Sequence, residues 1–205
     1  MIAICEIDDY PRGGLEIFEI LDEIKSNHPD FKMTIFAIPY EMNDENYKPI
    51  EERKDWIRLG VHGWNHEVKE SYYPSRRNAH IHARKKVDKL LDLQYDFAKI
   101  FKPRAYSYSW PLIEALRQRE YTISLSSNYD LLHGHHLYHK WFSSFETNIG
   151  IKATFLNNKD IKIFYGHTTE DHFDYFPRFY NKKFKKQMRK GNYQFKFSED
   201  VSVMI

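Results

Sequence analysis

Cysteine is almost absent from this chain. The 205 residues include a single cysteine, Cys5, which lies inside the first apolar run. No disulfide can therefore form within the chain, and a metal site built from several thiolates is excluded. A reducing compartment is compatible with this composition.

Long apolar runs are also missing. No stretch reaches the length of a membrane-spanning helix. Residues 1–7 lack the basic start, the long apolar centre and the small-residue cleavage site of a secretory leader. We therefore expect a cytoplasmic protein with no membrane span.

Neither sign of charge is in large excess. The chain has 31 Lys and Arg against 29 Asp and Glu, a formal net charge of +2, so its overall field does not predict a polyanionic partner. One segment is densely basic, and it leaves two interpretations open: phosphate binding, on a nucleic acid or a nucleotide-linked sugar, or a solvated helix face. Its cations are Lys182, Lys183, Lys185, Lys186, Arg189 and Lys190.

The order of elements predicts an α/β fold in one domain spanning residues 1–205. Short apolar runs alternate with segments of helical period, as in parallel sheets joined by crossover helices. Strands are expected at 2–7, 33–39, 59–62, 104–110, 121–126, 141–145 and 161–165. Helices are expected after the glycine pair at 13–14, then at 43–57, 79–101 and 112–119.

The C-terminal residues suggest a further element. Tyr193, Phe195 and Phe197 alternate with polar residues, residues 198–200 are polar, and apolar alternation resumes at Val201. This pattern predicts a β-hairpin appended to the domain after the basic segment at 181–190.

Several residues able to do chemistry fall at the ends of predicted strands. Asp8 and Asp9 end the first strand, His62 and His66 follow the third, and His167 follows the last. In parallel barrels the carboxyl ends of the strands gather the reactive groups. Two imidazoles and one carboxylate suit zinc or a similar divalent ion with a position open for water, which leaves the second carboxylate to act as a base.

Each signal alone has an ordinary explanation. An acidic pair after a strand often forms a solvated turn or caps a helix. With eleven histidines in the chain, a pair four residues apart is close to chance. A second histidine cluster at residues 133–139 could hold another metal, line a cleft or lie in a solvated loop.

The order of the motifs resembles that of the polysaccharide deacetylases, the NodB-like carbohydrate esterases. The resemblance runs from residue 4 to about residue 168 and is strongest in CEIDDY (5–10) and GVHGWNHE (60–67), with IKIFYGHT (161–168) near its end. It implies an incomplete (β/α)7 barrel that carries a divalent metal, expected to be zinc. It also implies that Asp8 is the catalytic base and Asp9 a metal ligand.

The same resemblance assigns further roles. His62 and His66 match the two metal-binding histidines, and His167 matches the general acid. A backbone N–H near Tyr106 would help to hold the oxyanion. Trp141 matches a tryptophan that receives the acetyl methyl group in relatives, although a buried core position explains it equally well.

The third motif departs from the family pattern. FKPRAYS (101–107) has Lys102 where the family usually has the arginine that orients the base, and Arg104 lies two residues on. Either cation, or neither, could take that role. Trp64, between the two histidines, could stack on a sugar ring.

The function expected from the resemblance is removal of acetyl groups from an N-acetylated sugar or polysaccharide. Two alternatives remain open at this stage. One is a non-catalytic carbohydrate- or nucleic-acid-binding protein on the same barrel. The other is an amidohydrolase of a small non-sugar amide.

Overall fold

The structure is a computed structural model that describes residues 1–67, 79–104, 109–125, 141–143, 146–148, 161–170, 175–179, 184–189 and 191–201. Its described strands form one nine-stranded sheet. They are β1 (Ile2–Tyr10), β2 (Met33–Ala37), β3 (Ile57–His62), β4 (Ile100–Lys102), β5 (Thr122–Leu125), β6 (Trp141–Ser143), β7 (Glu146–Asn148), β8 (Ile161–His167) and β9 (Gln194–Lys196).

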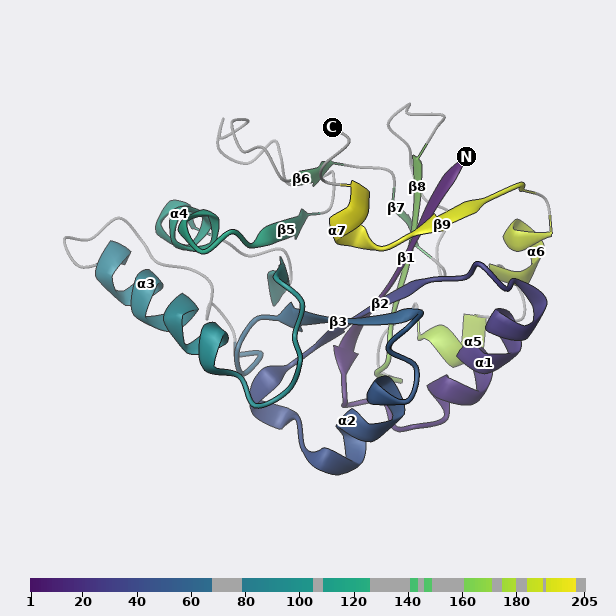
Figure 1. The fold of residues 1–205 in the computed structure, drawn as a ribbon, viewed down its shortest axis with the longest axis horizontal. Helices are drawn as coiled ribbons and strands as arrows, with labels where there is room; N and C mark the ends of the chain where they lie inside the picture. Colours follow the sequence, from purple (N-terminus) through teal and green to yellow (C-terminus); the bar gives the residue numbers. More distant parts are fainter. Residues whose placement is uncertain are drawn as a thin grey trace.

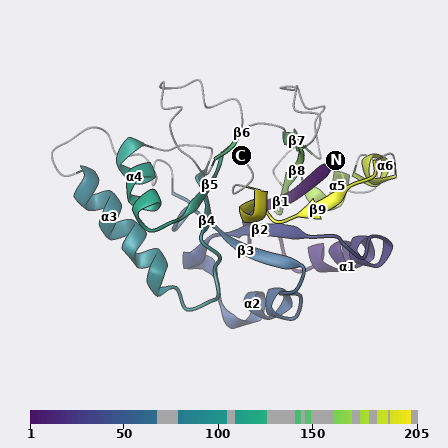
Figure 2. The same ribbon diagram turned by 45° about the horizontal axis from the view of Figure 1, so that its top comes forward.

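The sheet is parallel throughout its described pairings and curls into a partial barrel (Figure 1). Its main path runs β6-β5-β4-β3-β2-β1-β8-β7, with β9 paired to β1. Turning the molecule shows the curvature of the strands, with helices along the outside (Figure 2). The predicted α/β class and incomplete barrel are confirmed.

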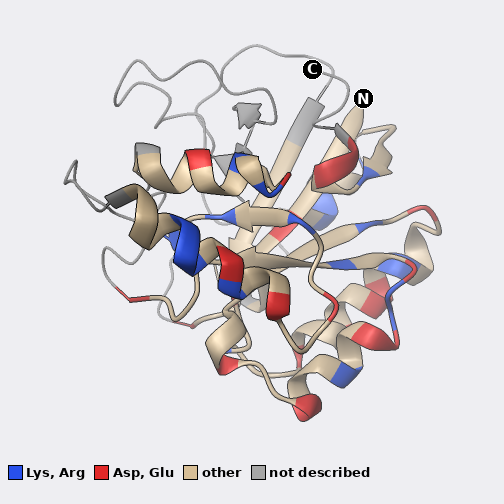
Figure 3. Cartoon of the chain, turned by 60° about the vertical axis from the view of Figure 1, so that its left-hand side comes forward, with Lys and Arg blue, Asp and Glu red and all other residues tan. Residues whose placement is uncertain are grey.

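Seven helices accompany the described strands. They are α1 (Ile17–Asn27), α2 (Asp44–Glu51), α3 (Ala79–Lys89), α4 (Trp110–Gln118), α5 (Phe176–Phe179), α6 (Lys185–Met188) and α7 (Ser198–Val201), with short 3-10 turns at Pro39–Glu41 and Leu90–Asp92. In Figure 3 the helices at the front carry blue and red bands interspersed, which agrees with the balanced net charge. No helix among the described residues is both long and apolar enough to cross a membrane.

Side-chain alternation along the strands separates two apolar regions. On β1, Ala3, Cys5 and Ile7 face the helices and join the main core. The intervening Ile4 belongs instead to a small cluster with residues of β2, β4 and β8, namely Phe36, Ile100 and Ile163. Because alternate residues of a strand face opposite sides, this second cluster fills the barrel interior.

Gly60 makes room in that interior. A Cβ atom at Gly60 would lie 2.8 Å from the ring of Phe36, closer than packed atoms normally approach. The missing side chain on β3 therefore lets the Phe36 ring of β2 fill the barrel.

Two of the predicted elements between residues 79 and 110 were wrong. The helix expected over 79–101 ends at Lys89. The strand in this region is β4, before the expected range of 104–110, and of that range residue 110 already belongs to α4 while residues 105–108 lie outside the described part. Ile100 and Phe101 are both buried, one inside the barrel and one against α4. Their pairing with β3 and β5 overrides the helical spacing that continues through the sequence.

The predicted terminal hairpin was also wrong. Its first strand forms as β9 but pairs parallel with β1, and Ser198 to Val201 make the short helix α7 instead of a turn. Since β8 occupies one edge of β1 along its length, β9 must use the other edge, next to the region that pairs with β2. Residues 202–205 lie outside the described part.

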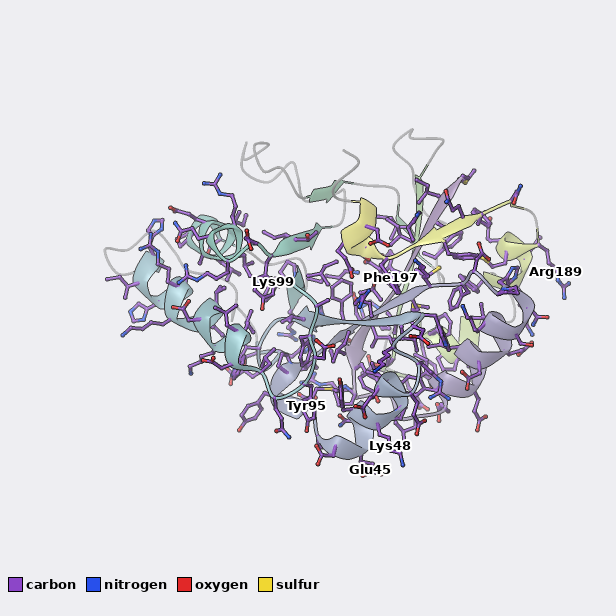
Figure 4. All side chains as sticks on the ribbon, in the orientation of Figure 1. Glu45, Lys48, Tyr95, Lys99, Arg189 and Phe197 are labelled. Carbon is purple, nitrogen blue, oxygen red and sulfur yellow. The ribbon has the colours of Figure 1, made fainter. Side chains whose placement is uncertain are left out.

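The helix α7 closes the end of the barrel where the strands begin. Its Glu199 pairs with Arg58 at the start of β3, with 2.8 Å between Oε1 and Nε. The Arg58 guanidinium also lies 4.6 Å from the ring centre of Phe197, which Figure 4 labels between α7 and β9. Residues 197–199 are thus packed against the start of β3.

The basic segment is partly folded into the core. Within its described residues, Phe184 and Met188 are buried in the main core. Lys185 pairs with Glu23 of α1 at 2.6 Å. The described part of this segment is therefore an amphipathic helix anchored on α1, and Lys182, Lys183 and Lys190 lie outside the described residues.

Candidate metal centre

Asp8 and Asp9 reach one site because β1 bulges where they stand. The pairing of β1 with β2 shifts register between Ile7 and Tyr10, and Asp9 has a left-handed backbone with φ of 68°. A bulge re-aims the side chain of its extra residue. Asp8 keeps its place in the ladder as the partner of His167 on β8, while Asp9 turns toward β3.

The turn after β3 brings two imidazoles together. Gly63 and His66 both have positive φ, 69° and 57°, so the chain reverses tightly over four residues. The ring centres of His62 and His66 lie 5.2 Å apart. A non-glycine residue held in the left-handed region costs about 1–3 kcal/mol, and here both Asp9 and His66 are held there.

These three side chains form a cluster able to hold a metal ion. Asp9 Oδ1 lies 3.3 Å from His62 Nε2 and 2.8 Å from His66 Nε2, and one ligand atom of each residue lies within 4.8 Å of the others. Ligands of a tetrahedral zinc ion lie about 3.3 Å apart. The donor set and its spacing therefore fit a divalent cation, with small adjustments.

A backbone contact orients His62 for this role. Its Nδ1 lies 2.9 Å from the carbonyl oxygen of Lys102. Since a carbonyl only accepts hydrogen bonds, Nδ1 carries the ring proton and Nε2 is left to face Asp9. Parallel pairing of His62 with Lys102 across β3 and β4 sets this geometry.

His66 has a different outer contact. Arg12 Nη1 lies 2.9 Å from His66 Nδ1, and Arg12 also forms an ion pair with Glu41. Because a guanidinium only donates, Nδ1 of the neutral ring accepts and Nε2 carries the proton toward Asp9. A cation bound at Nε2 would need that proton on Nδ1, so Arg12 would have to turn away.

Burial and neighbouring groups shift the pKa values of the cluster in opposite directions. Burial alone would raise the pKa of Asp9, but the contacts with the His62 and His66 rings, and the charges of His62 and His167, hold this pKa well below its usual range. Burial lowers the pKa of His66 against the opposing hydrogen bond and charge of Asp9, and the charges of His62 and Arg104 add to the lowering. These shifts favour an ionised Asp9 and a neutral His66, which are the charge states of metal ligands, but the ring proton of His66 must still move from Nε2 to Nδ1.

Lys102 lies beside Asp8, deep inside the barrel. Its Nζ is 3.1 Å from Asp8 Oδ2 and 2.9 Å from Glu6 Oε2, and its side chain is fully buried. The ring centres of Phe36 and Tyr165 lie 5.3 and 5.2 Å from the same ammonium. Of the two cations in the third motif, Lys102 is the one placed next to Asp8.

One oxygen of Asp8 is buried without a hydrogen bond to any described residue. Asp8 Oδ1 is buried and has no hydrogen-bond partner among the described residues. Such an atom normally faces water or an ion. The lone pairs of this oxygen are therefore not engaged by any described residue.

The end of β8 ties His167 and its neighbours to the acidic pair. Thr168 donates from its backbone N–H and from Oγ1 to the carbonyl of Asp8, at 3.0 and 3.1 Å. Thr169 Oγ1 donates to Asp9 Oδ2 at 3.3 Å. His167 is the β8 partner of Asp8, and its charge acts on Asp9.

The remaining predicted site residues have different placements. Trp64 is half-buried against the α3 and α4 core, with Lys89 Nζ 5.8 Å from its ring centre. Arg104 acts on His66 through its charge. Trp141 begins β6, but its side chain is outside the described part, as are Tyr106 and the histidine cluster at 133–139.

Sequence reasoning missed several residues that the fold brings to this region. Arg12 and Glu41 follow the ends of β1 and β2, so the strand-end rule that selected the histidines also applied to them. Glu6 stands inside the first predicted strand, where the strand-end rule does not apply. No local pattern pointed to the hydroxyls of Thr169 and Ser198.

Comparison with known proteins gives a consistent answer on fold. No protein-family model matches the sequence, and no curated protein matches it. A family 4 acetyl xylan esterase from Clostridium thermocellum, in complex with cobalt, aligns over 100% of this chain and 91% of its own, at 14% identity and a TM-score of 0.63. The chain has the fold of the family 4 deacetylases.

Other structures with the family 4 fold agree. The polysaccharide deacetylase Bc1974 from Bacillus cereus aligns over 96% of this chain and 91% of its own, at 13% identity and a TM-score of 0.55. BA3943 from Bacillus anthracis, described as a family 4 pseudoenzyme, aligns over 98% of this chain and 65% of its own, at 14% identity and a TM-score of 0.56. The family 4 fold thus accompanies both active and inactive proteins.

Proposed function

We propose that this protein is a metal-dependent hydrolase that removes an acetyl group from an N-acetylated sugar or polysaccharide. One observation carries the proposal. A buried carboxylate, Asp8, and a histidine, His167, are paired on adjacent strands beside an Asp9, His62 and His66 cluster that fits a divalent cation. A binding protein would need neither the second carboxylate nor the histidine opposite it.

The metal would be held by Asp9, His62 and His66. Zinc is the proposed ion, because two imidazoles and a carboxylate suit it. When bound, such an ion supplies a Lewis acid for the amide carbonyl and lowers the pKa of a bound water. The lowered pKa of Asp9 keeps the carboxylate ionised for this role.

Asp8 and His167 would move the protons. Asp8 Oδ1 is buried and has no hydrogen-bond partner among the described residues, which supports a role for it in taking a proton from the attacking water. Lys102 holds the other oxygen, Oδ2, and fixes the orientation of the carboxylate. His167 would give a proton to the departing nitrogen, so that acetate and a free amine result.

Trp64 would form part of the sugar-binding surface. It lies between the two proposed histidine ligands in sequence and is half-buried. An aromatic face of this kind suits the apolar face of a pyranose ring. Arg104, Tyr106 and Trp141 remain proposed contacts of the acetylated substrate, on the strength of the motif resemblance.

A non-catalytic carbohydrate-binding protein is the second candidate. It is favoured by one specific observation, the likeness in fold to the pseudoenzyme BA3943. This candidate predicts no acetate release by the wild type and glycan binding that Asp8→Asn leaves unchanged. The hydrolase predicts the opposite for turnover.

Acetate release separates the two candidates. Purified protein is stripped with a chelator, reloaded with zinc or cobalt, and incubated with N-acetylated mono- and oligosaccharides and with small non-sugar acetamides. We expect metal-dependent acetate release from the sugars, abolished in His62→Ala along with the bound metal. Release from the small acetamides alone would favour an amidohydrolase, and glycan binding with no release would favour the binding protein.

A further inference from the structure

The ammonium of Lys102 is shared between two carboxylates of one strand. Glu6 and Asp8 stand two residues apart on β1, so both side chains enter the barrel on the same face. Lys102 Nζ contacts an oxygen of each, 2.9 Å from Glu6 Oε2 and 3.1 Å from Asp8 Oδ2. All three side chains are almost completely buried.

Glu6 is in turn held by the C-terminal helix. Ser198 Oγ donates to Glu6 Oε1 at 2.6 Å, across 192 residues of sequence. The same hydroxyl lies 3.2 Å from Thr34 Oγ1 on β2, and Ser198 is fully buried. One oxygen of Glu6 therefore faces α7 and the other faces Lys102.

This arrangement decides where the ammonium sits. A lysine has a flexible four-carbon stem and a charge without directional preference, so its position follows from the anions around it. With Glu6 ionised and fixed, the ammonium is drawn between two carboxylates. Without that charge it would be drawn toward Asp8 alone and would engage the base more fully.

We propose that Glu6 and Ser198 are positioning residues for Asp8, acting through Lys102, so that helix α7 is part of the machinery that sets the base. The inference rests on the proposed function for the role of Asp8. It goes beyond that function by linking a C-terminal hydroxyl at the closed end of the barrel to the reacting end. The chain of contacts is Ser198, Glu6, Lys102 and Asp8.

The test compares three variants with the wild type. Ser198→Ala removes only the hydroxyl that fixes Glu6. Glu6→Gln keeps the shape but removes the charge. Phe195→Leu is the matched control, because Phe195 is a buried residue of the same segment that packs in the main core and outside this chain of contacts.

The proposal predicts a separation between stability and turnover. We expect kcat to fall about tenfold in Ser198→Ala and about a hundredfold in Glu6→Gln, because small displacements of a reacting group have effects of this size. KM and bound metal should stay at wild-type values in both. Phe195→Leu should lose thermal stability at least as much as Ser198→Ala while keeping its kcat, measured well below its melting temperature.

Two results would overturn the proposal: wild-type kcat in Ser198→Ala, or an equal fall of kcat in Ser198→Ala and Phe195→Leu. Should Glu6→Gln fail to fold, Ser198→Ala still decides. Crystal structures of Ser198→Ala and Phe195→Leu give a readout without activity. If the contact between Lys102 Nζ and Asp8 Oδ2 is unchanged in Ser198→Ala, the positioning role is refuted, whether or not the wild-type protein is active. If the wild-type protein releases no acetate, the proposed function is refuted.

Discussion

Substitutions of Asp8 and Asp9 should have different effects, because the two carboxylates have different neighbours. Asp8 contacts Lys102, whereas Asp9 contacts both histidines. Asp8→Asn keeps the shape of the side chain and loses its basicity. We expect metal content to stay at the wild-type level while kcat falls about a hundredfold to ten-thousandfold, the usual contribution of a positioned base. Metal analysis and acetate release measure the two quantities on one preparation.

Asp9→Asn should weaken metal binding instead. The substitution removes the one charged ligand and leaves two neutral imidazoles. Activity should be low in chelator-treated buffer and should recover in part with excess zinc or cobalt. If Asp8→Asn lost metal while Asp9→Asn kept it, the two roles proposed here would be exchanged.

Arg12 should oppose metal binding. It donates to His66 Nδ1 and so favours the tautomer with the proton on Nε2, the atom that faces Asp9. Arg12→Leu removes both the donor and a nearby positive charge. We expect a dissociation constant for zinc about two- to fivefold lower, a modest effect because the arginine side chain is 36% exposed. Calorimetric titration measures it, and weaker zinc binding in Arg12→Leu would argue that Arg12 supports the loaded site.

Among the elements, the loop between β1 and α1 depends on a close approach of two backbones. A Cβ atom added at Gly13 would lie 1.7 Å from the carbonyl oxygen of Thr168, just after His167 and before Thr169, which contacts Asp9. We expect Gly13→Ala to cost about 3 kcal/mol or more of unfolding free energy, because neither backbone can move without disturbing the strand ends. It should also reduce zinc affinity.

Gly14 provides the matched control for that prediction. It has a positive φ of 75°, and only Glu16 Oε2, at 3.8 Å, lies near an added Cβ. Gly14→Asn keeps a residue that tolerates the left-handed region, so it should cost about 1 kcal/mol or less. Urea unfolding of both variants compares them, and equal costs would show that the approach of Gly13 to Thr168 is easily relaxed.

Elements fixed by their own residues were predictable, and elements fixed by distant ones were not. Apolar runs or helical spacing in the sequence predict the first three strands, α1, α4 and β8. The structure has these elements with bounds within a few residues of the predicted ones. β4 is three residues long and pairs on both sides, so its identity comes from neighbours far away in the sequence. β7, also three residues long, had no sequence signal at all.

The candidate site divides in the same way. Strand ends identified Asp8, Asp9, His62 and His66, because parallel strands bring those ends together. The choice of Lys102 over Arg104 beside Asp8 needed the register of β4 against β3. The contact of Ser198 with Glu6 crosses 192 residues, a distance over which local pattern carries no information.

At the scale of the whole molecule, β9 and α7 should be required for stability. They bury Phe195 and Phe197 and cover Glu6 and Thr34 inside the barrel. A chain ending at residue 190 would expose this surface, and the two rings alone account for about 4 kcal/mol of burial. We expect the melting temperature to fall by about 10 °C or more, or the protein to aggregate. Calorimetry and size-exclusion chromatography test this, and a monodisperse truncated protein with an unchanged melting temperature would contradict it.

The bond between Ser198 and Glu6 also has a consequence for how the protein is made. β1 is synthesised before β9 and α7. The edge of β1 at residues 2–4 and the side chain of Glu6 find their partners only when β9 and α7 have been made, 192 residues later. Contacts of such long separation form slowly, and until they form the nascent barrel exposes an open strand edge and an unsealed charged interior. Synthesis that stops short of residue 198 would therefore yield a chain that holds every proposed metal ligand and both proposed proton carriers, and still lacks the hydroxyl that fixes Glu6.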